Sequence, residues 1–152
     1  MKVFIGSDHG GYALKEVVKA YLEAQGYEVV DKGTYDGSVS VDYPDYGRAV
    51  AEAVAAEAGS FGIVICGTGI GISLAANKVP GIRAALCTDP YMARMAREHN
   101  DAQILAMGGR VVGPGLAMAI VDAFFAAEFQ GGRHARRVGK IAAIEAEYCG
   151  KR

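Results

Sequence analysis

Short runs of apolar, often β-branched residues alternate along this chain with longer segments whose apolar residues recur every three or four positions. The short runs predict buried strands at 3–6, 28–31, 62–66, 83–87 and 104–107. The longer segments predict helices at 12–25, 46–58, 71–78, 90–99, 113–125 and 133–148. Strands that alternate with helices form a parallel sheet covered on both faces. The pattern therefore predicts one Rossmann-like, doubly wound, three-layer α/β/α domain over residues 1–152, with about five strands.

Turn residues support these boundaries. Gly26 and Gly59 end two of the predicted helices, and Asp89 followed by Pro90 is typical of a helix start. Residues 32–45 form a long polar connection, which favours a functional role. Within it, Tyr43 belongs either to a plain turn before the next helix or to an aromatic wall against a small polar ligand.

Composition narrows the classes of partner. The net charge of −1 and the absence of any long run of one charge sign give no bulk attraction to nucleic acid or to an anionic membrane. Three scattered cysteines without C-x-x-C spacing indicate free thiols in a reducing compartment, and the N-terminus runs directly into a strand without a leader. We therefore expect a cytoplasmic protein without a metal site, a cofactor or a membrane segment.

The segment from Phe61 to Ser73 carries the strongest chemical signal. An apolar strand ends on Cys66 and passes into the alternating glycines Gly67, Gly69 and Gly71. Such a turn exposes backbone N–H groups to an anion, and a thiol beside it is a candidate base or nucleophile. The alternative is a small buried hydrophobe at a strand end. The spacing is not that of G-x-G-x-x-G, and no Walker lysine follows the glycines.

Other candidates follow from the rule that ligands bind beyond the carboxyl ends of parallel strands. Asp8 and His9 follow the first strand and either cap the next helix or contact an anion; Arg110 follows the last strand. His99 and Asn100 precede a strand, which places them at the opposite edge or in a partner's site. Arg133 and Arg137 share a helix face and either are solvated or clamp a phosphate, while His134 and Arg136 are expected to face solvent.

Together these segments resemble the type B ribose-5-phosphate isomerases and the related galactose-6-phosphate isomerase subunits. The matching motifs lie in one collinear order over almost the whole chain: 6–11 (GSDHGG), 42–44 (DYP), 65–73 (ICGTGIGIS), 75–78 (AANK), 81–83 (GIR), 98–101 (EHND), 109–110 (GR) and 131–137 (GGRHARR). One branch of the family has a glutamate after the glycines where this chain has Ile72, so the cysteine branch is the better match.

The resemblance implies a reversible aldose–ketose isomerisation of a sugar phosphate through a cis-enediolate, with a role in the pentose phosphate pathway. It assigns Cys66 as the base and His99 as the ring-opening acid, with Thr68 and Asp8 in the same catalytic set. It implies that the backbone of the loop holds the enediolate and that the remaining positions bind sugar and phosphate: Asp8, His9, Tyr43, Gly67, Thr68, Gly69, Ile70, Gly71, Asn100, Arg110, Arg133 and Arg137.

The resemblance also implies a homodimer or a dimer of dimers with sites shared between subunits. His99, Asn100 and Arg110 are then expected from the partner, and helix 133–148 is expected to pack on it. Ribose 5-phosphate is the leading substrate, and allose 6-phosphate, galactose 6-phosphate and erythrose 4-phosphate remain alternatives. From another class, a non-catalytic phosphate- or nucleotide-binding protein would also use such a glycine turn.

Overall fold

Residues 1–150, which the computed structural model describes, contain one parallel sheet of five strands in the order β2-β1-β3-β5-β4. The strands are β1 (Lys2–Ser7), β2 (Glu28–Asp31), β3 (Phe61–Cys66), β4 (Ala84–Leu86) and β5 (Ile104–Gly108). From β1 the chain passes to β2 on one side and then to β3 on the other side. In open α/β sheets, ligands bind where the strand order reverses, which in this chain is at the carboxyl ends of β1 and β3.

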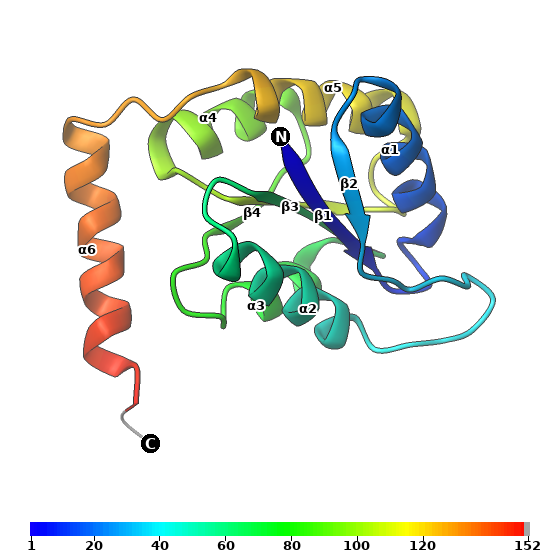
Figure 1. Ribbon diagram of the computed structural model, residues 1–152, viewed down its shortest axis with the longest axis horizontal. Coiled ribbons are helices and arrows are strands. Elements are labelled where there is room, and N and C mark those ends of the chain that lie inside the picture. Colours follow the sequence, from blue (N-terminus) through cyan, green and yellow to red (C-terminus); the bar gives the residue numbers. More distant parts are fainter. Residues whose placement is uncertain (151–152) are drawn as a thin grey trace.

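Helices cover both faces of the sheet, as the sequence predicts (Figure 1). One face packs against α1 (Tyr12–Ala24), α4 (Pro90–Asn100) and α5 (Pro114–Ala126). The other face packs against α2 (Tyr43–Ala56) and α3 (Ile70–Ala76). Because β3 and β5 lie between two apolar layers, they are buried over nearly their whole length, which explains their unbroken apolar sequences.

The start of α2 differs from the sequence prediction by three residues. The helix begins at Tyr43, with Asp42 at its N-cap and Pro44 in the first turn, whereas the polar sequence predicted a loop up to residue 45. Proline fits the first turn because the N–H it lacks has no partner there anyway. At α4, the predicted cap is confirmed, since a carboxylate oxygen of Asp89 accepts a 2.8 Å hydrogen bond from the Met92 N–H.

The last helix, α6 (Arg133–Tyr148), stands apart from the rest of the molecule (Figure 1). An extended segment leads to it from α5, and the helix starts beside the end of α4. Further along, Glu145 accepts a 2.9 Å hydrogen bond from the N–H of Gly81. Most side chains of α6 remain exposed. None of the helices in residues 1–150 is long and apolar enough to cross a membrane.

Candidate functional site

The turn between β3 and α3 is built around Cys66. Its side chain is buried at the end of the strand, and its Sγ accepts a 3.1 Å hydrogen bond from the N–H of Gly69. Gly69 has φ +80°, and a Cβ there would lie 2.7 Å from the carbonyl carbon of Met107. Only glycine fits both requirements, so the backbone closes tightly around the sulfur. The structure therefore presents the thiol together with a backbone donor, as the glycine pattern predicts.

Tyr43 reaches the same turn from the start of α2. A Cβ added to Gly71 would lie 2.5 Å from the Tyr43 ring, so the ring rests directly on the backbone of the turn. Thr68 is exposed at the tip, and its Oγ1 accepts a 3.2 Å hydrogen bond from the N–H of Ile70. Tyr43 therefore lies in the first turn of α2 and against the turn that follows Cys66, and its role as an aromatic wall for a ligand stays a prediction.

Asp8 and His9 lie beside the turn at the end of β1. The buried Asp8 carboxylate accepts a 3.0 Å hydrogen bond from the N–H of Gly11, just before α1. His9 is half-buried, and its Nδ1 accepts a 3.2 Å hydrogen bond from the N–H of Val41. In a neutral imidazole this leaves Nε2 as the N–H donor. Asp8 therefore fixes the local backbone, while His9 keeps a donor for a ligand.

The connection from β2 to α2, which carries Val41, is anchored by a buried lysine. The Lys15 side chain is 0% exposed, and its Nζ donates to both Asp31 oxygens at 2.7–2.8 Å and to the Thr34 carbonyl at 2.7 Å. Burial is the largest influence on the Asp31 pKa and acts to raise it, but the hydrogen bonds from Lys15 and the Gly33 N–H together with the charges of Lys15 and Lys19 outweigh burial, so the Asp31 pKa is lowered. Sequence reasoning did not single out Lys15, although it lies on the apolar stripe of its helix, three residues before Val18.

Arg110 also belongs to this group of residues. Its N–H donates to the Gly67 carbonyl at 3.0 Å, and a Cβ on Gly67 would lie 3.3 Å from the Arg110 Nη1 atom. The expectation that Arg110 reaches the site from a partner was therefore wrong: it lies against the cysteine turn of its own chain. The tight β5-to-α5 turn brings it there, because β5 is the direct neighbour of β3. We call Cys66 with its turn, Asp8, His9, Tyr43 and Arg110 the cysteine half-site.

His99 lies elsewhere, at the junction of α4 and α6. Its ring stacks on that of His134, with centroids 4.1 Å apart and planes 7° from parallel. His134 is only 7% exposed, which corrects the expectation that it faces solvent: helix α6 turns it inward against the end of α4. Burial, followed by the positive charges of His99, Arg133 and Arg137, lowers the pKa of His134.

Arg133 and Arg137 both belong to the first turns of α6, as their spacing predicts, and both are exposed, as is Asn100. We call His99, Asn100, Arg133, His134 and Arg137 the histidine half-site. This half-site was only partly found from sequence, because His134 stood between two arginines and gave no apolar signal of burial.

The two half-sites lie at opposite edges of the sheet. Cys66 pairs with Gly108 at the carboxyl end of β5, whereas His99 precedes the start of that strand at Ile104. Four residues of strand between these levels span roughly 13 Å. In Figure 1, β1 runs from beside the N-terminus toward the side of the sheet that faces away from α6. One chain therefore does not bring His99 to the thiol.

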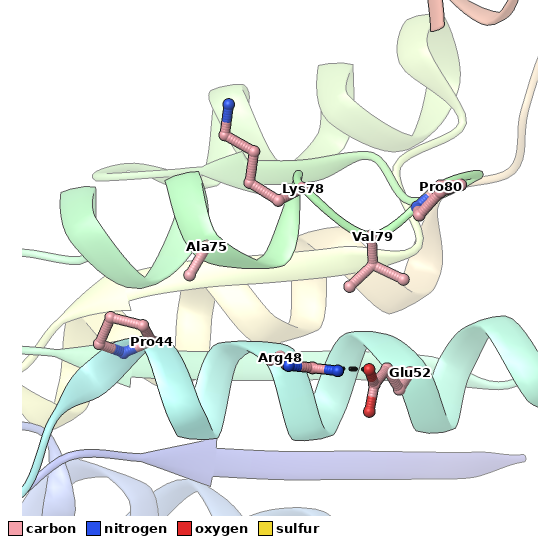
Figure 2. Close-up of a pocket in the computed structure, with 7 residues that line it drawn as sticks. All are labelled: Pro44, Arg48, Glu52, Ala75, Lys78, Val79 and Pro80. Atoms are coloured by element: carbon pink, nitrogen blue, oxygen red, sulfur yellow. Dashed lines mark hydrogen bonds and ion pairs between the residues drawn. The ribbon is translucent and has the colours of Figure 1, made fainter. Parts of the chain in front are cut away.

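A groove of about 480 Å³ between α2 and α3 is lined by none of the residues of the two half-sites. Figure 2 shows Arg48 paired with Glu52 on its α2 wall, while Lys78 extends away from that helix. Its lining contains no thiol or imidazole. Within residues 1–150 no group of three or more His, Cys, Asp or Glu side chains is arranged to hold a metal ion.

Comparison with known proteins places the chain in a family. Residues 3–141 match the family model described as ribose/galactose isomerase. The chain is 53% identical to ribose-5-phosphate isomerase B of Escherichia coli over 95% of this chain and 96% of that protein.

Solved structures show the same fold. Ribose-5-phosphate isomerase B of Clostridium thermocellum has a TM-score of 0.95 and 66% identity over 97% of this chain and 99% of that one. The Mycoplasma genitalium enzyme, solved with bound ribulose-5-phosphate, has a TM-score of 0.92 and 41% identity over 96% and 97% of the two chains.

Proposed function

The chain belongs to the ribose/galactose isomerase family and is an isomerase of the type B ribose-5-phosphate isomerase kind, and on that premise we propose that it interconverts ribose 5-phosphate and ribulose 5-phosphate. The observation that carries the proposal is the Cys66 sulfur, which accepts a 3.1 Å hydrogen bond from the Gly69 N–H in a turn that Tyr43 and Arg110 contact at Gly71 and Gly67. A passive phosphate cradle would need the glycines but not the thiol.

In the proposed reaction, the Cys66 thiolate removes the proton from C2 of the open-chain aldose. Electrons move toward the carbonyl, and a cis-enediolate forms with negative charge on its oxygens. Backbone N–H groups of residues 67–71 stabilise this charge where it develops. The thiol then returns a proton to C1, while a proton moves between O2 and O1, so that ketose and free thiolate result. Thr68 and Asp8 lie beside this path and contact the sugar.

Ring opening requires His99, and the separation of the half-sites supports a site shared between two copies. We place His99 and Asn100 of one copy against the cysteine half-site of the other. The helix α6 carries Ile141, Ile144 and Tyr148 at helical spacing, and they are 49%, 59% and 66% exposed. Such a stripe is suited to pack on a second copy. The proposed assembly is thus a homodimer or a dimer of dimers.

The phosphate is assigned to cations from both half-sites. His9 and Arg110 contribute from the chain that carries Cys66, and Arg133 and Arg137 contribute from the second copy. Guanidinium groups bind phosphate oxygens through paired, charge-assisted hydrogen bonds. The three cysteines are free thiols, which supports the cytoplasm as the proposed location.

The decisive experiment compares kcat/KM for ribose 5-phosphate, allose 6-phosphate, galactose 6-phosphate and erythrose 4-phosphate, using the purified single chain. We expect ribose 5-phosphate to give the highest value. A higher value for another aldose phosphate would replace the substrate but keep the chemistry.

A second measurement tests the base. Replacing Cys66 with Ala should abolish isomerisation while leaving ribose 5-phosphate binding nearly intact. Full activity in that variant would refute the proposed mechanism, and tight nucleotide binding without turnover of any sugar phosphate would favour the non-catalytic alternative.

A further inference from the structure

The turn that follows α4 has an unusual backbone. Asp101 has φ +46° and ψ +44° at the C-cap of the helix, and it is the one non-glycine residue among residues 1–150 with positive φ. This conformation is unfavourable for a residue with a Cβ and persists where surrounding contacts enforce it. Because His99 and Asn100 directly precede Asp101, the turn sets the position of the histidine half-site.

Arg83 enforces this turn from outside α4. Its Nε donates to the Asn100 carbonyl at 2.9 Å, and its Nη2 donates to the Asp101 carbonyl at 3.0 Å. The same Nη2 lies 3.5 Å from a carboxylate oxygen of Asp101. A planar guanidinium holds two successive carbonyls in fixed relative positions, which a single ammonium does not. Arg97 completes the turn from within α4, donating to the Asp101 side chain at 2.9 Å and to the Ala102 carbonyl at 2.7 Å.

Arg83 is itself held firmly at the start of β4. Its backbone N–H donates to Gln103 Oε1 at 2.8 Å, and Gln103 Nε2 donates to the Gly81 carbonyl at 2.8 Å. The next residue, Ala84, exchanges hydrogen bonds of 2.8 and 2.9 Å with the side-chain amide of Asn77. The guanidinium therefore extends from a fixed backbone, and its side chain is only 23% exposed.

We infer that Arg83 is a positioning residue for ring opening: it holds the turn at Asn100 and Asp101 so that His99 is presented at the correct angle to a cyclic sugar. The inference rests on the proposed function. The hydrogen bonds and the ion pair described for the Arg83 side chain all go to Asn100 and Asp101. None of them reaches the cysteine half-site. The effect of Arg83 should therefore be confined to the step that His99 performs.

Two measurements separate this step from proton transfer at carbon. Ribose 5-phosphate reaches the enzyme as a ring and must be opened, whereas ribulose 5-phosphate has no ring because its C5 oxygen carries the phosphate. Exchange of a C1 proton of ribulose 5-phosphate with D₂O therefore reports the Cys66 step alone. In Arg83→Ala we expect kcat for ribose 5-phosphate to fall by at least about tenfold, with the exchange rate within about twofold of wild type.

Three further variants make the result interpretable. Arg83→Lys, which keeps one donor and the charge, should fall between wild type and Arg83→Ala. His99→Asn should show the same selective loss in larger measure. Arg48→Ala removes an exposed arginine paired only with Glu52 among its described ion pairs and should leave both rates unchanged.

Equal loss of both rates in Arg83→Ala and Arg83→Lys would show a general structural role and overturn the inference, as would unchanged rates in both variants. Wild-type protein that supports neither reaction would instead refute the proposed function.

Discussion

The cysteine half-site and the histidine half-site differ in which part of the chain sets their geometry, the backbone in the first and side chains in the second. Around Cys66 the backbone supplies the geometry, through a glycine turn that has no room for side chains and an N–H directed at the sulfur. Around His99, side chains supply the geometry. The His134 ring stacks on the His99 ring where α4 ends and α6 begins, and Arg83 donates a hydrogen bond to the Asn100 carbonyl at the end of α4. Charge that develops on an enediolate needs rigid donors, whereas ring opening needs a group that can take up and release a proton.

The largest expected effect concerns the proposed division of one active site between two copies. Cys66→Ala and His99→Asn should each be nearly inactive, yet mixing them under conditions that exchange subunits should restore activity. Random pairing makes half of all dimers mixed, and each mixed dimer has one intact site of two, which gives about one quarter of wild-type activity. The measurement is ribose 5-phosphate turnover before and after exchange.

A matched control uses Cys66→Ala mixed with a Cys66→Ala, His99→Asn double variant; this mixture lacks the Cys66 thiol in every chain and should stay inactive. If the first mixture also stays inactive although mixed dimers are detected by mass, both half-sites must act from one chain, and the proposed sharing is wrong.

The second prediction tests whether the tightly packed backbone around Gly69 is required for the geometry of the cysteine half-site. Gly69→Ala places a Cβ at positive φ and against Met107, so we expect the free energy of unfolding to fall by about 3 kcal/mol. Gly131 also has positive φ, at +66°, but nothing lies within 4 Å of its added Cβ. Gly131→Ala should therefore cost only about 1 kcal/mol. Urea unfolding of both variants checks this, and equal losses would remove the contrast.

The third prediction concerns phosphate binding by the histidine half-site. Arg137→Ala would remove the proposed charge-assisted contact with the phosphate, so KM for ribose 5-phosphate should rise on the order of 10- to 100-fold with little change in kcat. Steady-state kinetics give both constants, and Arg136→Ala is the neighbouring control, which should change neither. A fall in kcat with unchanged KM would show that Arg137 does not bind the phosphate.

The smallest effect is the pH dependence that His134 gives to stability. Its pKa in the folded protein lies below the ordinary 6.5, because of burial and the nearby His99, Arg133 and Arg137, with Glu98 acting in the opposite direction. Below that ordinary value the unfolded chain binds the proton first, so His134 lowers stability as pH falls. Unfolding midpoints of wild type and His134→Gln should therefore diverge between pH 7.5 and 5.5, with wild type losing more. Parallel curves would exclude this role.

The contrast between half-sites also explains what the sequence could predict. The Cys66 turn is local: strand, thiol and glycines are contiguous, so the sequence alone predicts a thiol beside a turn of backbone N–H groups, and the structure shows one such N–H, that of Gly69, donating to the sulfur. The strands and helices followed from periodicity, with α2 starting early because Pro44 is a first-turn residue and not a loop residue.

Two other placements could not be predicted in this way. His134 is buried only because α6 folds back against α4, and Arg110 reaches Gly67 only because β5 is the neighbour of β3. Both depend on contacts between distant segments, which residue spacing along the chain does not encode.

The enclosed pair of Lys15 and Asp31 has a consequence for behaviour on heating. Removing ions from water becomes less costly as temperature rises, while the stabilisation from buried apolar area levels off. The contribution of this pair to stability should therefore grow relative to that of the apolar core in warm conditions. Lys15 also donates to the Thr34 carbonyl, in the connection between β2 and α2 that brings the Val41 N–H to His9. This connection is therefore anchored by an ionic contact whose contribution to stability should fall little on heating. The connection between β2 and α2 would then keep its shape up to temperatures close to global unfolding.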